Sequence, residues 1–182
     1  MNTGIISMRY AKALLAYSKE QGLEEATYMN MLQLLHTLVV IKEFPTLLRA
    51  PSLSKKERVE LLCSAVESTP VFENFARLVV DKERESFLLF IAHCYVSLYR
   101  NDKNILAVEL TTAVTVNKEL KERISALMSR DGTVNVELTC KVDESIIGGF
   151  VCETESGRLD ASIARGLSDV RKQLIKENRK LV

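Results

Sequence analysis

The spacing of hydrophobic residues changes once along the chain, near residue 104. Before that point they recur every three or four positions, which is the spacing of helices that bury one face. Helices are predicted over residues 5–20 and 23–43, from Ser54, from Thr69, and over residues 84–100. We therefore expect five or six amphipathic helices packed into a compact bundle.

Capping residues set several of the expected helix boundaries. Ser54 followed by Glu57 forms a capping box, in which each side chain bonds the backbone N–H of the other residue. Thr69-Pro70 is a second start signal, because a capping hydroxyl precedes a proline at the first helical position. Pro45 is expected to end the helix over residues 23–43, since proline disfavours helical geometry in the residue before it.

After residue 104 hydrophobic and polar residues alternate, as in strands with one buried face. Strands are predicted over residues 106–116, 134–142 and 149–154, with a hairpin partner over residues 158–161. Helices are expected from Asn117 and over residues 162–180. The predicted fold class is mainly α: an N-terminal six-helix bundle over residues 1–103, followed by a small C-terminal α/β domain over residues 104–182.

Composition and charge narrow the classes of function. The chain has 182 residues, of which 47% are hydrophobic, so a well-packed core is expected. The net charge of +1 gives no sign of a basic surface committed to nucleic acid. No apolar run reaches the ~18–20 residues that cross a bilayer, and no signal peptide is apparent, so we expect no direct membrane insertion.

The sequence contains no motif typical of a catalytic, cofactor or metal site. A phosphate-binding loop, GxGxxG, GxSxG and HExxH are all absent. The four cysteines form no CxxC pair, and only His36 and His93 could join them as metal ligands. We expect no enzyme activity, no cofactor and no metal; these cysteines and histidines are the only motivation for the enzyme alternative.

Four segments in order along the chain resemble the delta subunit family of F-type ATP synthases, which includes the mitochondrial oligomycin sensitivity-conferring protein. They are RYAKALLAYSKEQG, FPTLLRAPSLSKKERVELL, FENFARLVVDKERESFLLFIAHCYVSLY, and SIIGGF with LDASIARGLSDVRKQL. The resemblance implies a non-catalytic peripheral-stalk, or stator, subunit of a bacterial-type enzyme, held on the cytoplasmic face of the cell membrane. In that family the helical bundle binds the N-terminal segment of an alpha subunit in the catalytic head. The C-terminal domain holds the C-terminus of the membrane-anchored b subunits, so that the stalk resists rotor torque during proton-driven ATP synthesis.

Two sets of residues are candidates for a role, one as a groove for the head and one as a structural motif of the C-terminal domain. By the family's usage the groove for the head lies between the first and fifth helices, with the candidates Tyr10, Ala13, Leu14, Tyr17, Phe75, Leu78 and Val79. The alternative is that most of these are ordinary core residues. In the C-terminal domain, Gly148, Gly149 and Phe150 are expected to shape the fold, and Asp160 and Ser162 to cap the last helix.

The last helix leaves a second function open. Its apolar stripe consists of Ile163, Leu167, Val170 and Leu174. Its other faces carry the basic residues Arg165, Arg171, Lys172, Lys176, Arg179 and Lys180. A solvated charged face is the simplest interpretation. The alternatives are binding to an acidic partner helix and a helical adaptor protein of another assembly, with or without RNA.

Overall fold

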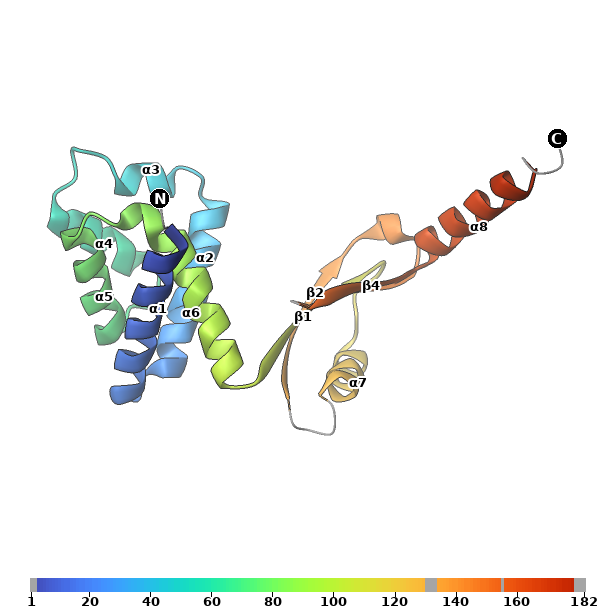
Figure 1. Cartoon of the computed structure of the whole chain (residues 1–182), viewed down its shortest axis with the longest axis horizontal. Helices are drawn as coiled ribbons and strands as arrows, with labels where there is room; N and C mark the ends of the chain where they lie inside the picture. The colour runs from blue at the N-terminus through green and yellow to red at the C-terminus, as the bar shows by residue number, and fades with distance from the viewer. Residues whose placement is uncertain (1–2, 130–133, 155, 179–182) are drawn as a thin grey trace. The chain divides into compact units, whose positions relative to one another are not determined.

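The computed structural model describes residues 3–129, 134–154 and 156–178. The chain divides into two compact units, Met1–Asp102 and Lys103–Val182. The first unit is helical, and the second combines helices with a four-stranded sheet, so the chain is mainly helical (Figure 1).

Six α-helices and one short 3-10 helix make up the described part of the first unit. In chain order they are α1 (Thr3–Glu20), α2 (Glu24–Val40), α3 (Phe44–Leu48), α4 (Lys55–Ser64), α5 (Pro70–Asp81), η1 (Glu85–Phe87) and α6 (Leu88–Asp102). Helix α6 packs against both α1 and α2, and α4 packs against α5 (Figure 1). The core between these helices is apolar and includes the fully buried side chains of Met31, Leu34, Phe72, Ile91 and Tyr95.

Both predicted capping signals are confirmed. Ser54 Oγ accepts the Glu57 N–H at 3.3 Å, and the Glu57 carboxylate accepts the Ser54 N–H at 2.7 Å, which completes the capping box of α4. These hydrogen bonds with Ser54 lower the pKa of the Glu57 carboxyl. Thr69 Oγ1 accepts the Phe72 N–H at 3.2 Å, and Pro70 is the first residue of α5.

The prediction that Pro45 ends the second helix is wrong. Helix α2 ends at Val40, and Pro45 lies in the first turn of the next helix, α3. The first turn tolerates proline because the N–H that proline lacks would have no partner within the helix. The five residues of α3 are too few to show a helical period, so the hydrophobic pattern does not reveal this helix.

The second unit is built around a sheet with strand order β2-β1-β3-β4. Its elements are β1 (Ile105–Thr112), α7 (Lys118–Met128), β2 (Asn135–Val142), η2 (Glu144–Ile146), β3 (Gly149–Thr154), β4 (Gly157–Ser162) and α8 (Ile163–Asn178). Strand β1 pairs in parallel with β2 and antiparallel with β3, and β3 and β4 form an antiparallel hairpin. The predicted first strand is too long, because β1 ends at Thr112 and leaves Val114 and Val116 in the following loop.

One face of the sheet carries the core of this unit. The strand register aligns Leu110 with Cys140 on one side and with Cys152 on the other. These residues pack with Val108 and Val116, and half-buried residues of α7 such as Ile124 cover them. Ion pairs also join neighbouring strands. Lys141 Nζ in β2 lies 2.6 Å from Glu109 Oε1 in β1, and Arg158 Nη1 in β4 lies 3.1 Å from Glu153 Oε1 in β3.

Two adjacent glycines at the start of β3, Gly148 and Gly149, allow the hairpin and α8 to meet closely. Gly149 has a φ of +74°, and a Cβ on it would lie 2.3 Å from the carbonyl oxygen of Ala161 in β4. A Cβ on Gly148 would lie 2.8 Å from Ile163 Cδ1, at the start of α8. The Gly148 carbonyl also accepts the Ile163 N–H at 3.0 Å. At Gly149 the close backbone approach and the positive φ require a residue without a side chain, whereas at Gly148 the near contact is with the end of the Ile163 side chain.

Replacing Gly149 by alanine should therefore destabilise the protein, by on the order of 1–3 kcal/mol, because the new Cβ meets backbone and the residue has a positive φ. A matched control is Gly166→Ala in α8, where the added Cβ meets nothing within 4 Å. Alanine is the better helix former, so the control should be stabilised by about 0.5–1 kcal/mol. Urea unfolding of both variants measures these changes, and equal stabilities would contradict this account of Gly149.

Candidate functional site: a groove between two helices

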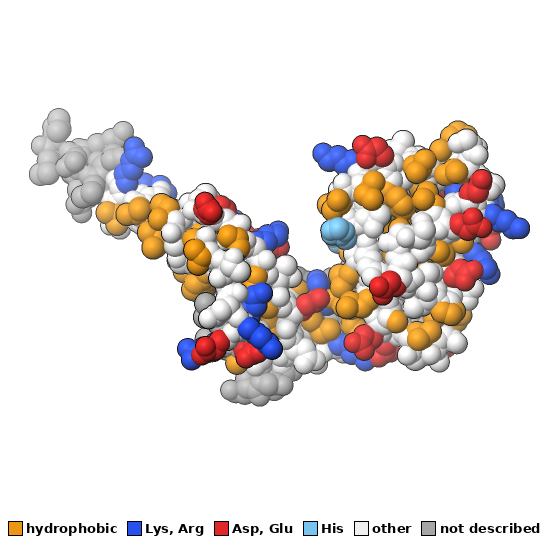
Figure 2. Space-filling view, turned by 180° about the vertical axis from the view of Figure 1, so that it is seen from behind, with side chains coloured by type: hydrophobic (Ala, Val, Ile, Leu, Met, Phe, Trp, Pro, Cys, Tyr) orange, Lys and Arg blue, Asp and Glu red, His pale blue; other side chains and the backbone are white. Residues whose placement is uncertain are grey.

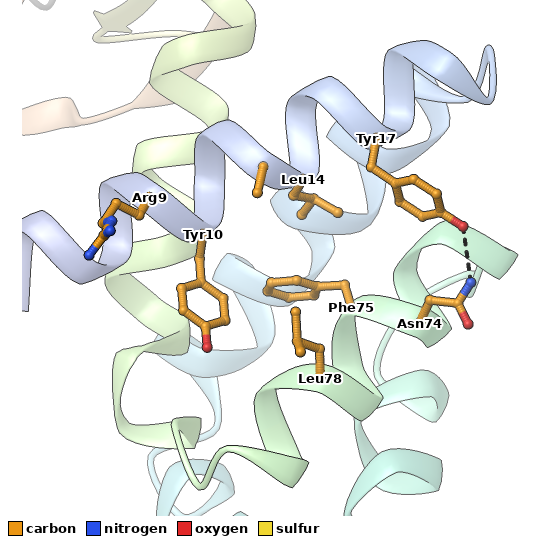
Figure 3. A pocket seen from close by; sticks show the side chains of 8 residues that line it. Arg9, Tyr10, Leu14, Tyr17, Asn74, Phe75 and Leu78 are labelled. Atoms are coloured by element: carbon orange, nitrogen blue, oxygen red, sulfur yellow. Dashed lines mark hydrogen bonds between the residues drawn. The ribbon is translucent and has the colours of Figure 1, made fainter.

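A groove of about 400 Å³ lies between α1 and α5 (Figure 3). Residues from both helices line it: Arg9, Tyr10, Ala13, Leu14, Tyr17, Asn74, Phe75 and Leu78. Six of the seven predicted groove residues are in this lining. The exception is Val79, which has no exposed surface and belongs to the core. The hydrophobic pattern missed Arg9 and Asn74, because both are polar.

The outward face of α1 forms one wall of the groove. Tyr10, Ala13 and Tyr17 follow one another at steps of three and four, so they lie on one face of the helix. Leu14 is almost completely buried beside them and contributes to the floor. Ala13 is exposed and has the smallest side chain in the wall, which leaves the groove hollow at its middle.

Helix α5 forms the opposite wall and the rest of the floor. Phe75 is 5% exposed, and in Figure 3 its ring lies between the two helices. Leu78 is 47% exposed and lies beside this ring (Figure 3). The middle of the groove is therefore apolar on both sides and open to a partner.

The two tyrosines of the wall are each held by a hydrogen bond, one at each end of the groove. At one end Arg84 Nη1 donates to the Tyr10 hydroxyl at 2.8 Å, and its Cζ lies 5.2 Å from the centre of the Tyr10 ring. At the other end Asn74 Nδ2 donates to the Tyr17 hydroxyl at 3.2 Å (Figure 3). Because both rings are held in this way, the walls of the groove are largely formed before any partner binds.

The dimensions of the groove match a short stretch of helix. From Tyr10 to Tyr17 helix α1 advances about 10 Å, or two turns. An amphipathic helix binds such a surface through apolar residues spaced three or four apart. Among the described residues that line the groove there is no carboxylate, histidine or cysteine. The arrangement is that of a protein-recognition surface.

In the second unit, Ser162 caps α8, as predicted, and Asp160 has a different role. Ser162 Oγ accepts the Arg165 N–H at 3.2 Å, in the first turn of the helix. Asp160 Oδ1 instead accepts the N–H of Ser162 itself, at 3.1 Å, and so positions the capping residue. The hydrogen bonds with Ser162, together with Arg165 and Arg158 nearby, lower the pKa of the Asp160 carboxyl.

A second apolar surface lies on α8, the helix that Ser162 caps, and includes Phe150 of β3. The α8 residues Ile163, Leu167 and Val170 are 50%, 59% and 53% exposed, and Phe150 at the start of β3 is 40% exposed. Leu174, Arg179 and Lys180, which complete the predicted stripe and basic faces, lie outside the described side chains. Figure 2 shows hydrophobic side chains gathered on this part of the chain. An exposed apolar stripe on a helix indicates a contact surface.

Within residues 3–129, 134–154 and 156–178, no three His, Cys, Asp or Glu side chains are grouped so that they could hold a metal ion. None of the described helices combines the length and the hydropathy that a membrane span needs.

The family model for the ATP synthase delta (OSCP) subunit matches residues 6–174. That match covers both units and includes the groove and most of α8. The chain belongs to the ATP synthase delta (OSCP) subunit family.

Individual proteins agree with this assignment. The chain is similar to ATP synthase subunit delta of Bacteroides fragilis, with 42% identity and all of both chains covered. It is 30% identical to ATP synthase subunit delta of Lactobacillus acidophilus, over 95% of this chain and 96% of the relative. A chain in the cryo-EM structure of the Toxoplasma gondii mitochondrial ATP synthase hexamer shares the fold, with a TM-score of 0.67 at 19% identity. That comparison covers 93% of this chain and 97% of the other.

The lowered pKa of Asp160 gives a pH prediction. The carboxylate favours the folded state above its ordinary pKa of about 3.9, and this contribution is lost as the pH falls through the lower, folded-state pKa. Asp160→Asn keeps an oxygen that can accept the Ser162 N–H but has no charge to titrate. We expect the wild type to be the more stable at pH 6 and to lose that advantage towards pH 2.

Urea unfolding between pH 2 and pH 6 measures this difference. As a control, Asp160→Ala lacks both the charge and the acceptor, so it should be less stable than Asp160→Asn throughout the range. A constant difference between the wild type and Asp160→Asn at all pH values would contradict the prediction.

Proposed function

We propose that the protein is a non-catalytic peripheral-stalk, or stator, subunit of a bacterial-type F-type ATP synthase. Its helical unit acts as a six-helix bundle that binds the N-terminal segment of an alpha subunit in the catalytic head. Its C-terminal unit binds the C-terminus of the membrane-anchored b subunits. The protein is thereby held at the cytoplasmic face of the membrane, and it resists rotor torque during proton-driven ATP synthesis.

The observation that carries this proposal is the groove between α1 and α5. Its middle is apolar, its length is about two helical turns, and both of its tyrosines are held by hydrogen bonds. A preformed apolar groove of this kind binds the apolar face of an amphipathic helix. In a chain that belongs to the delta (OSCP) family, the N-terminal segment of an alpha subunit is the partner that this groove supports best.

The second attachment is supported by the exposed stripe on α8. A single helix with an apolar stripe offers no groove, so its partner has to bring a stripe of its own, as paired helices do. The C-terminus of a helical stalk subunit meets this requirement. Membership of the family and the exposure of Leu167 and Val170 are what support this half of the proposal.

The alternative of an adaptor in an RNA-containing assembly has weaker support. Binding to phosphates needs a cluster of basic residues that are free to pair with them. On α8, Asp169 lies 3.8 Å from Arg165 and 3.5 Å from Lys172, and Asp160 lies 3.9 Å from Arg165. These carboxylates reduce the positive potential of the helix.

A charge placed in the groove should prevent binding to the head. Leu78→Asp puts a carboxylate among apolar residues, so we expect at least about tenfold weaker binding of a synthetic peptide from the N-terminus of the alpha subunit. The control Leu47→Asp makes the same change in α3, at a similar exposure of 49% and away from the groove lining. Titration calorimetry with the full chain measures both affinities. If the wild type fails to bind this peptide, or if Leu78→Asp binds as tightly as Leu47→Asp, the proposed site is wrong.

A charge in the α8 stripe should weaken the attachment to the stalk. Val170→Asp interrupts the exposed apolar stripe, whereas Ser168→Asp adds the same charge at an exposed position outside it. We expect Val170→Asp to lower the affinity for the extramembrane part of the b subunit at least about fivefold and to leave peptide binding by the groove unchanged. Sedimentation or calorimetry of the two variants would exclude α8 as the contact if they bind this fragment equally well.

A further inference from the structure

The groove has one charged side chain in its described lining, Arg9 of α1. In Figure 3, Arg9 and Tyr10 lie towards one end of the groove, and Tyr17 and Asn74 lie at the other. The two ends therefore differ in charge. At the Tyr10 end Arg84 adds a second guanidinium, whereas at the other end the hydrogen-bonded pair of Tyr17 and Asn74 is neutral.

Arg9 differs from the other arginines of the helical unit in having no partner among the described residues. Each of the other five donates a hydrogen bond to another residue of this unit. Arg49 donates to the Pro45 carbonyl, Arg58 to Glu85, Arg77 to Glu73, Arg84 to Tyr10 and Arg100 to Tyr28. The N–H donors of the Arg9 guanidinium thus have no acceptor among the described residues, and they lie at the edge of an apolar groove.

The acidic residues on the two walls do not neutralise this end of the groove. On α5, Glu73 pairs with Arg77, and Asp81 lies 3.6 Å from Lys55. Both carboxylates line a different groove, between α4 and α5. The one acidic residue of α1 is Glu20, at the C-terminal end of the helix and beyond Tyr17.

We propose that Arg9 is a specificity-determining residue of the groove. It selects a helical partner segment that carries an Asp or Glu beside its apolar stripe, at the end that lies next to Tyr10. A guanidinium pairs with a carboxylate through two parallel hydrogen bonds, which gives directional recognition that apolar packing lacks. The pair would fix which part of the partner helix enters the groove. This inference rests on the proposed function, because it concerns the same partner.

The test is a double-mutant cycle with the full chain and two synthetic peptides. One peptide has the sequence of the alpha-subunit N-terminus, and in the other its Asp and Glu residues are replaced by Asn and Gln. The protein variants are Arg9→Gln and the control Lys12→Gln, which removes the same charge from an exposed position of α1 that is outside the groove lining. Both positions are exposed, so both variants should keep the wild-type Tm.

We expect Arg9→Gln to weaken binding of the acidic peptide by about threefold to tenfold at low salt, and Lys12→Gln to have little effect. The loss should shrink as salt is added and should disappear with the amide peptide. Equal affinities of wild type and Arg9→Gln for the acidic peptide, with Leu78→Asp still defective, would overturn the role of Arg9 and leave the groove intact. Failure of the wild type to bind either peptide would instead overturn the proposed function.

Discussion

The packing of α1 against α6 is the interaction on which the helical unit and its groove depend. Three side chains on the buried stripe of α1 are small: Ser7, Ala11 and Ser18 have no exposed surface. Small residues let two helix axes approach closely, so α1 is held along its length by α6. The Ser18 hydroxyl also bonds the hydroxyl of the buried Tyr95 at 3.0 Å, and Lys19 pairs with Asp102 at 2.6 Å near the end of both helices.

This arrangement determines which face of α1 remains available. With one face buried against α6, the face with Tyr10, Ala13 and Tyr17 points away from that contact and towards α5. Helix α5 is supported separately by α4, so the two walls are fixed by different neighbours. Phe75 fills the floor between them, and Ala13 leaves space above it. The groove is therefore a consequence of how the core packs, and a partner does not have to create it.

Much of this fold could be predicted from the sequence, because hydrophobic periodicity and capping are local properties. The capping box at Ser54 and the hairpin of β3 and β4 are examples, since each depends on residues close together in the chain. The role of Pro45 cannot be predicted in this way, because a proline can end one helix or begin another, and the choice depends on tertiary packing. The position of Val79 illustrates a related limit. It follows Leu78 directly, but neighbouring residues on a helix point about 100° apart, and only the fold decides which of the two is exposed.

The polar members of the groove could have been found by the same spacing that found the apolar ones. Arg9 lies four residues before Ala13, and Asn74 lies four residues before Leu78, so helical geometry puts each on the face of its apolar neighbour. A search restricted to hydrophobic positions excludes them. Spacing along one helix does not predict which residues they contact. The hydrogen bond from Asn74 to Tyr17, for example, joins residues 57 positions apart. Such contacts exist only after α1 and α5 have been brought together.

The groove and the α8 stripe differ in what they require of a partner. The groove has two walls and a floor, and hydrogen bonds already hold its tyrosines. Its side chains therefore need little reordering when a helix binds there. The α8 stripe is the face of one helix, and its exposed isoleucine, leucine and valine can be covered only by a partner that supplies further apolar side chains. A groove suits a short segment that is disordered until it binds, and a bare stripe suits a long helix that is already formed. That difference supports the proposed function, in which the groove binds the N-terminal segment of an alpha subunit and α8 binds the b subunits of the stalk.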